Sequence, residues 1–377
     1  MFEAIRATLL VSGLVFPGIA AYTAVYVTLA CMALSLPCVE RDVLRSRIVL
    51  GLAVGLAALF VSILLNGAAP GDWTVLLILL PFVGVLPVAA VLKRVTPVHF
   101  GTFCLLGAIA AAMIGAIDVF ALDATRAGGG NNPIHYASVG AMLGFVSLVG
   151  AVGNRSGARF VFVFGPAAAA AAVLLSESRG PMLAICVLMV IALAIFWRDR
   201  KMFLALLALP LAVALALIAS GEGQRAMLLF WDVLSERTQS SNDQRWLMYN
   251  AALQMFLQSP LSGHGFGNLM ETAQSLLPIH ERYDNLHSDF ANLAALGGIL
   301  GIITYFGIVF SPLLALLSSA ARSDRAIVFL ALAVSGGNAT LGLTNAILGI
   351  LPQMTLFVLM LGYLVALERR AELADPQ

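Results

Sequence analysis

Long runs of apolar residues alternate with short polar breaks along most of this sequence. An apolar helix of about 20 residues crosses the hydrocarbon core of a bilayer, so each run predicts a transmembrane helix. Residues 4–38 are too long for one helix and break at Pro17-Gly18, which predicts two helices, the first of them short. Further spans are predicted at about 48–66, 73–92, 99–121, 134–153, 158–176, 181–197, 202–220, 287–317, 326–345 and 350–367. The total is twelve, and a long polar stretch, 221–286, precedes the last three.

The composition supports an all-α polytopic membrane protein. Hydrophobic residues make up 60% of the chain and charged residues 11%, and the mean hydropathy is +0.96. These values exclude an ordinary soluble domain. The period-2 alternation of a β-barrel is absent, and helices satisfy their own backbone hydrogen bonds in lipid. A net charge of +1 gives no indication of a nucleic-acid partner.

Lysine and arginine are divided unequally between the two sets of loops that join the predicted helices. Fourteen of the 21 fall in one set and six in the other, while Arg6 lies at the start of the chain. Because basic loops stay inside, we expect both termini in the cytoplasm. The expected organisation is nine helices in residues 1–220, an outward loop at 221–286, and three helices with a short cytoplasmic tail in 287–377. The six outward basic residues are Arg126, Arg179, Arg225, Arg237, Arg245 and Arg282.

A histidine opens the first helix after the outward loop. His287 lies in the polar cluster 285–290, directly before an apolar segment that continues to about Leu317. The start of a helix carries unpaired N–H groups and the positive end of the dipole, which favours a neutral imidazole. A neutral imidazole is the form that a general base needs. The alternative is that His287 only caps or anchors the helix.

Two outward arginines also lie at predicted helix starts, where a cation opposes the dipole unless an anion is near. Arg179 stands in a turn just before Pro181, and an ion pair with Glu177 is the alternative to a functional role. Arg245 lies in the first turn of an amphipathic helix predicted at 244–259, and Asp243 or a lipid phosphate is its alternative partner. The apolar face of that helix is predicted to contain Trp246, Tyr249, Leu253 and Phe256, and to lie along the bilayer surface.

Other polar positions are weaker candidates for substrate contact. Arg126 precedes a glycine-rich turn at 128–133, and His264 lies in a second such turn at 263–268. The second turn does not follow a strand, so it is not a dinucleotide loop. The four cysteines lie in or beside apolar stretches, which indicates neither a disulfide framework nor a zinc site.

The outward residues by themselves indicate an outward-facing, anion-binding membrane enzyme or transporter, and one reaction fits them. Arginine binds phosphate oxygens bidentately and stays charged, and a neutral histidine can accept a proton from a hydroxyl. We expect no metal and no cofactor, so arginines would stabilise a departing diphosphate. The predicted reaction is glycosyl transfer from a lipid diphosphate, with His287 activating the acceptor hydroxyl.

Several motifs of this sequence resemble those of the O-antigen ligase/polymerase superfamily. They are more similar to the motifs of the WaaL O-antigen ligases than to those of the polymerases. Arg179 is followed four residues later by Leu183, as in the ligases. The ligase pattern is His, then Asn, Ser or Gln, nine residues, Gly, two residues, and a small residue or Tyr. It matches His287-Ser288, Gly298 and Gly301. Asp243-Gln244-Arg245 and the turn 260–265 are similar to the family's loop helix and its following turn. Asn132-Pro133-Ile134 resembles a weaker feature.

The resemblance implies a GT-C-like fold in the bacterial inner membrane with the active site facing the periplasm. It implies inverting, metal-independent transfer of polysaccharide from undecaprenyl diphosphate to a lipid A–core sugar. By position, His287 would be the base, and Arg179 and Arg245 would bind the diphosphate. Possible further substrate contacts are Arg126, His264, Ser288 and Asp289. The implied partners are the lipid-linked donor, the lipid A–core acceptor and membrane lipids.

Three other functions remain open at this point. A polymerase relative would use the same donor but extend another lipid-linked glycan. A transporter or flippase should have internal repeats or broken helices and binding groups on both sides, whereas the unusual charges here lie on one side. An intramembrane protease would need a Ser/His pair or paired aspartates, and the sequence presents neither convincingly.

Overall fold

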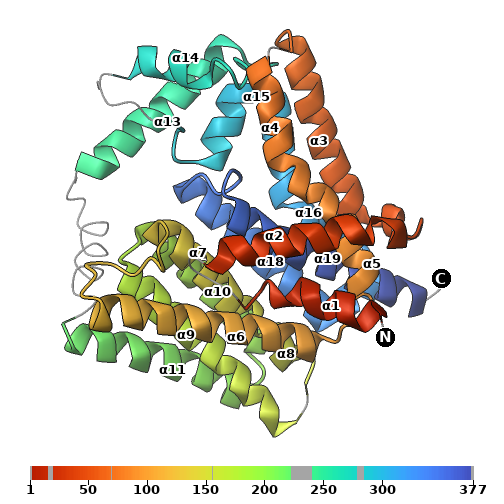
Figure 1. Cartoon of the computed structure of the whole chain (residues 1–377), viewed down its shortest axis with the longest axis vertical. Coiled ribbons are helices and arrows are strands. Elements are labelled where there is room, and N and C mark those ends of the chain that lie inside the picture. The colour runs from red at the N-terminus through yellow and green to blue at the C-terminus, as the bar shows by residue number, and fades with distance from the viewer. Residues whose placement is uncertain are drawn as a thin grey trace.

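The computed structural model describes residues 2–15, 20–68, 70–154, 156–221, 240–277 and 284–374, and all regular secondary structure within these ranges is helical (Figure 1). Ten segments in these ranges are long and apolar enough to span a membrane. They confirm a polytopic all-α membrane protein. The spans are α3 (Arg47–Leu65), α4 with α5 (Pro70–Leu92), α6 with η4 (Pro97–Ala121), α7 with α8 (Pro133–Val152), η5 with α9 (Gly157–Ser176), α10 (Arg179–Phe196), α11 (Arg200–Ala219), α15 (Asp289–Val309), α18 (Arg325–Thr344) and α19 (Leu351–Ala374).

Ten of the twelve predicted spans correspond to these segments, and the two predicted in residues 4–38 do not. That region forms α1 (Phe2–Ser12, 11 residues) and α2 (Ala20–Ser35, 16 residues). The structure thus has two helices here, the first of them short, as the sequence predicts, and α2 continues into a 3₁₀ turn at Leu36–Cys38. Neither helix is among the ten segments found in the described residues. The predicted break at Pro17-Gly18 lies outside the described residues.

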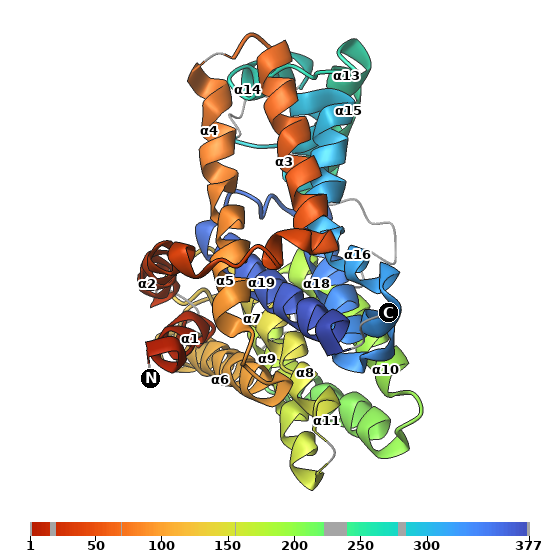
Figure 2. The ribbon, with the colours of Figure 1, turned by 90° about the vertical axis from the view of Figure 1, so that its right-hand side faces the viewer.

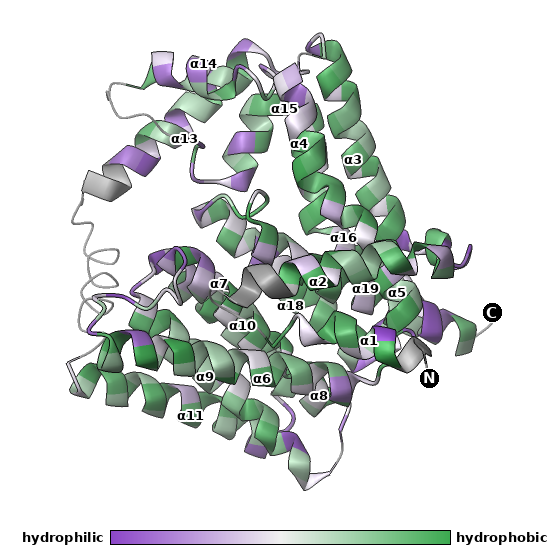
Figure 3. Ribbon diagram, viewed as in Figure 1, coloured by the Kyte–Doolittle hydropathy of each residue, from purple (hydrophilic) through white to green (hydrophobic). Residues whose placement is uncertain are grey.

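The other predicted spans keep their place, but some of them are interrupted. The predicted span 73–92 divides into α4 (Pro70–Leu79), a 3₁₀ turn and α5 (Val85–Leu92). The predicted span 287–317 ends as α15 at Val309, followed by the short helix α16 (Ser311–Leu314). Figure 3 shows apolar residues covering the spans and polar residues concentrated in the connecting segments and in α13 (Ser240–Gln258). The surface is therefore suited to lipid along the spans.

Helices α3 and α15 are distant in sequence but lie side by side (Figure 2). Glycines permit the close approach, because a Cβ on Gly55 would lie 3.1 Å from the Cα of Gly307. The Thr304 hydroxyl donates to the Gly55 carbonyl oxygen at 2.9 Å. Small residues at a helix crossing let backbones pack without a hydrophobic driving force, which lipid does not supply. This pair carries the start of α15 at one end of the molecule.

Helix α15 is broken at Gly298, whose φ of 58° and ψ of −137° are not helical. The backbone on both sides of this break forms hydrogen bonds with the turn 260–265. Ile299 N–H donates to the Pro260 carbonyl at 2.8 Å, and Gly265 N–H donates to the Leu296 carbonyl at 3.0 Å. A Cβ on Gly298 would lie 2.6 Å from the Pro260 oxygen, so only glycine fits there. The break thus attaches the segment after α13 to the middle of α15.

Helix α13 has one face buried against the protein and another face exposed. Met248, Ala251 and Met255 are buried, and α13 packs on α15. Trp246 and Leu253, which the sequence predicts to lie along the bilayer surface, are 66% and 54% exposed. The contact of this exposed face with the bilayer stays a prediction.

Candidate functional site

Backbone strain occurs in several loops on the side of the molecule that the sequence predicts to be outward. Four described residues other than glycine have a positive φ, namely Ala68, Asp123, Glu177 and His287. Each lies in a loop on the side that the sequence predicts to be outward. Such conformations cost about 1–3 kcal/mol each and often occur at functional sites. We call this side of the molecule the site end, and the opposite side, where most lysines and arginines lie, the basic end.

His287 occupies the entrance to α15, as predicted, with a φ of 52° and a half-buried side chain. Its N–H donates to Asn285 Oδ1 at 2.8 Å, and the N–H of the preceding Leu286 donates to Asn292 Oδ1 at 2.9 Å. Ser288 caps the helix, since its hydroxyl accepts from Ala291 N–H at 3.3 Å. These bonds hold the backbone of His287 in one conformation, which orients the imidazole.

Asp289 connects the start of α15 to the loop after α18. Its buried carboxylate accepts from Ile347 N–H at 3.0 and 3.1 Å and from Leu348 N–H at 3.0 Å. Gly342 lets α18 come close, because a Cβ there would lie 2.7 Å from Asp289 Oδ2. Asp289 is therefore engaged within the protein and positions the segment beside His287.

Arg179 is the first residue of α10, as the sequence predicts. The next residue, Gly180, packs on the end of α18, where a Cβ would lie 2.5 Å from Thr344 Oγ1. The turn before Arg179 is held by Arg126, whose Nε donates to the Ser176 carbonyl at 2.9 Å. Arg126 also donates to Ser178 Oγ at 3.1 Å. The guanidinium of Arg126 thus shapes the turn that presents Arg179.

The glycine-rich turn beside Arg126 is fixed by a carboxylate. Asp118 Oδ2 accepts from Gly128 N–H at 2.9 Å and from Gly129 N–H at 2.6 Å. Ala127 N–H donates to the Leu175 carbonyl at 2.9 Å. Asp118 thereby orders this turn against the end of α9 (Phe164–Ser176).

Helix α13, which bears Arg245, contacts the end of α18. Tyr249, one helical turn later, donates its hydroxyl to the Leu343 carbonyl at 2.9 Å. Burial raises the pKa of Tyr249, and the nearby Arg245 cation opposes that shift. Arg245 is half-buried and lies about 6 Å along the axis from the residue that contacts α18.

The segment Leu343–Leu348, at the end of α18, thus contacts the three elements that bear or directly follow the predicted site residues. It contacts α13 through Tyr249, α10 through Gly180 and α15 through Asp289. Within it, Asn345 is 7% exposed and its Nδ2 has no hydrogen-bond partner among the described residues. A buried donor without a partner at such a junction is available to a ligand oxygen. The elements that bear Arg179, Arg245 and His287 therefore meet at this junction, beside the Asn345 amide donor.

His264 takes a different position from these residues. Its Nε2 lies 2.9 Å from the Met255 carbonyl oxygen, and its N–H donates to the Ala295 carbonyl at 3.1 Å. His264 therefore links the end of α13, through its ring, to α15, through its backbone N–H. It forms neither of these contacts with the Leu343–Leu348 segment. The outward arginines Arg225, Arg237 and Arg282 lie outside the described residues.

A family model described as O-antigen ligase matches residues 164–306. Over these residues the chain is similar to the O-antigen ligase family, which supports the resemblance to the O-antigen ligase/polymerase superfamily. No curated protein matches it.

The ligase-family match contains Arg179, Arg245 and His287 together with the helix break at Gly298. The family includes O-antigen ligases and related polymerases, so glycosyl transfer of this class is the activity that the match indicates. Asp118, Arg126 and the Leu343–Leu348 segment lie outside the matched residues, and only the structure connects them to the site.

Sequence reasoning missed the role of the Leu343–Leu348 segment. The available signal was Thr344-Asn345 at the outward end of an apolar span, where polar groups have to be satisfied or used. It also missed Tyr249 as a link to α18, since tyrosine at an amphipathic position reads first as an apolar contact. Within the described residues, no group of three or more His, Cys, Asp or Glu side chains is placed to hold a metal.

Asp289→Ala is expected to weaken the site without removing a reacting group. The change leaves Ile347 and Leu348 N–H without their acceptor, at a cost of about 1–3 kcal/mol for a buried unsatisfied donor. The measurement is the thermal unfolding midpoint of the purified protein in detergent, which should fall. Asp289→Asn keeps one acceptor oxygen and should fall less; equal midpoints for the wild type and Asp289→Ala would contradict the assigned role.

Proposed function

We propose that this protein is an O-antigen ligase. It transfers polysaccharide from undecaprenyl diphosphate to a sugar hydroxyl of lipid A–core in the periplasmic leaflet, by inverting glycosyl transfer that does not use a metal. The observation that carries the proposal is the meeting of three helices, bearing Arg179, Arg245 and His287, at the Leu343–Leu348 segment.

In the proposed reaction, His287 accepts the proton of the acceptor hydroxyl. The hydroxyl oxygen attacks the anomeric carbon as its bond to the diphosphate oxygen breaks, and undecaprenyl diphosphate leaves with the electron pair. Arg179 and Arg245 stabilise the charge that develops on the diphosphate, and arginine suits this task because its planar fork matches two phosphate oxygens. Asn345 Nδ2 would donate to the sugar or the diphosphate.

The proposed location follows from the charges of the loops. Most basic residues lie at the basic end, which the positive-inside rule assigns to the cytoplasm. The site end then faces the periplasm of a bacterium with an inner membrane, and both termini are cytoplasmic. The exposed stripe of Trp246, Leu253 and Leu257 on α13 supports an orientation with this helix against the outer leaflet.

The decisive experiment uses purified protein in nanodiscs with an undecaprenyl-diphosphate glycan and a chelator. One reaction receives lipid A–core and the other a second lipid-linked glycan. Product with lipid A–core alone supports a ligase. Product with the second glycan alone assigns the protein to the polymerases of the same superfamily. No product in either reaction, together with donor movement across the bilayer, would overturn the proposed enzyme.

The arginine assignment makes a separate prediction. Arg179→Ala and Arg245→Ala should each lower the rate of transfer about a hundredfold, the loss typical of one preorganised donor to a developing anion. Arg179→Lys should also be poor, because an ammonium does not reproduce the bidentate fork. The matched control is Arg200→Ala, which removes an exposed arginine at the basic end. Wild-type rates for Arg179→Lys would reduce Arg179 to a point charge in a structural ion pair.

A further inference from the structure

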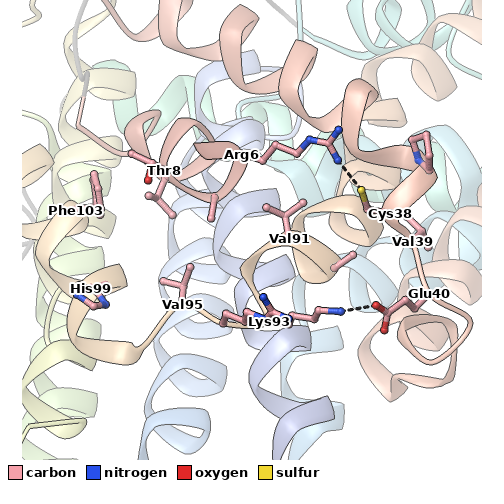
Figure 4. Close-up of a pocket in the computed structure, with 15 residues that line it drawn as sticks. Arg6, Thr8, Cys38, Val39, Glu40, Val91, Lys93, Val95, His99 and Phe103 are labelled. Atoms are coloured by element: carbon pink, nitrogen blue, oxygen red, sulfur yellow. Dashed lines mark hydrogen bonds and ion pairs between the residues drawn. The ribbon is translucent and has the colours of Figure 1, made fainter. Parts of the chain in front are cut away.

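A polar cavity lies at the basic end of the molecule, remote from the candidate site (Figure 4). Its volume is about 720 Å³, within the range of pockets that bind small molecules. Residues from α1, from the segment after α2, from the end of α5 and from the start of α6 line it. Helix α6 (Pro97–Ala116) contributes His99 here and leads to Asp118 at the site end. Its 20 residues place the cavity about 30 Å from the candidate site.

Cations outnumber carboxylates in this cavity. Arg6, Lys93 and Arg94 line it together with one acidic residue, Glu40. Lys93 forms an ion pair with Glu40, and their side chains are 39% and 58% exposed. Arg6 lies outside the Lys93–Glu40 pair, so the described lining keeps a positive charge that Glu40 does not balance. An anion that enters the cavity would meet a field of its opposite sign.

Arg6 is the most informative of these cations. Among the described residues its hydrogen-bond partner is the Cys38 sulfur, 2.8 Å from an Nη1 atom, as Figure 4 also shows. A thiol is a weak acceptor, and a guanidinium offers five donors. The guanidinium of Arg6 is thus held at the cavity wall, and most of its N–H donors can bind a ligand. This is the arrangement that phosphate oxygens satisfy best.

The rest of the lining is apolar. Val11, Val91, Val95 and Phe103 extend the wall beside the charged groups. Lys93 and Arg94 directly follow the end of a membrane span at Leu92, so the charges lie at the level of lipid headgroups. A ligand that fits both parts has a phosphate and a hydrocarbon chain. Basic pockets between helices at a membrane surface bind anionic headgroups for this reason.

We propose that this cavity binds the phosphate headgroup of an anionic phospholipid, with Arg6 as the bidentate contact, Lys93 as the second cation and an acyl chain along Val91 and Phe103. The site does not depend on the proposed glycosyl transfer. With the basic end in the cytoplasm, the lipid would come from the inner leaflet. A water-soluble phosphate compound shares the headgroup chemistry, and the apolar wall favours the lipid over it.

The test is native mass spectrometry of the full-length protein in detergent. It is titrated separately with dioleoyl phosphatidylglycerol, dioleoyl phosphatidylcholine and glycerol 1-phosphate. The wild type should retain phosphatidylglycerol more tightly than either other compound. Arg6→Gln should weaken this binding about fivefold, since one basic residue near a membrane surface contributes about that factor. Arg6→Gln combined with Lys93→Gln should weaken it more than tenfold, while Arg6→Lys should retain more binding than Arg6→Gln.

Two exposed basic residues provide matched controls. Arg200→Gln and Lys201→Gln remove the same charges at the start of α11, outside the cavity lining, and should leave phosphatidylglycerol binding unchanged. Equal loss in the control and cavity variants would reduce the effect to general surface charge and overturn the site. Tighter binding of glycerol 1-phosphate than of phosphatidylglycerol would replace the lipid by a soluble phosphate compound. Unchanged phosphatidylglycerol binding in the Arg6→Gln, Lys93→Gln double variant would overturn the phosphate site for a lipid and for a soluble compound alike.

Discussion

His287→Ala is expected to abolish measurable glycan transfer, with a rate loss of about 10²–10⁴-fold, the usual contribution of a positioned general base. The residue begins the helix whose capping and bracing groups, Ser288 and Asp289, hold its backbone. Without the imidazole, the acceptor hydroxyl has no group to take its proton. The measurement is the initial rate of transfer to lipid A–core by protein in nanodiscs.

A matched variant separates the loss of imidazole from a change in the backbone. The φ of His287 is 52°, which glycine adopts without cost and alanine only at about 1 kcal/mol. His287→Gly should therefore unfold at or above the midpoint of His287→Ala and still be inactive. Added imidazole should restore part of its rate, more so at higher pH where imidazole is neutral. A fully active glycine variant would show that the ring only anchors the helix.

Gly298→Ala should give the largest loss of stability among single substitutions in α15. The residue has a conformation almost restricted to glycine, which costs other residues about 1–3 kcal/mol. The new methyl group would also lie 2.6 Å from the Pro260 oxygen and 2.8 Å from the Leu261 carbonyl carbon. The turn 260–265 would have to separate from α15, and Arg245 would move with α13. Both the unfolding midpoint and the transfer rate should fall.

Gly157→Ala is the control for that substitution. A Cβ on Gly157 has no neighbour within 4 Å, and its φ is not in the left-handed region. Its unfolding midpoint and transfer rate should match those of the wild type. If Gly298→Ala behaves like Gly157→Ala, the break in α15 is not needed for the fold or for the site.

The spans were predictable because the bilayer imposes a simple rule on helix length and hydropathy. The rule gave the ten spans from α3 to α19, most of them within a few residues, and two helices in residues 4–38, the first of them short. It could not give the break in α15. An isolated glycine in an apolar helix reads as a packing contact until the partner chain at Pro260 is known.

The candidate residues were predictable from charges that stand at helix starts on the less basic side. Arg179 and His287 lie where that argument placed them. Their meeting point was not predictable, since Tyr249, Gly180 and Asp289 come together only through the end of α18. Contacts between helices depend on which small residues face each other, and periodicity in one helix contains no information about the partner.

The pairing of α3 with α15 has a consequence for synthesis of the protein. Gly55 and Thr304 are 249 positions apart, yet they share a hydrogen bond in the membrane interior. As the ribosome releases the chain, α3 enters the bilayer early and its glycine face has only lipid against it until α15 follows. Assembly must therefore wait for a late helix, and slow long-range contacts of this kind limit folding rates. Helix α15 begins two residues after His287. Membrane insertion of α15 therefore completes the helix pair and positions the proposed base in the same step.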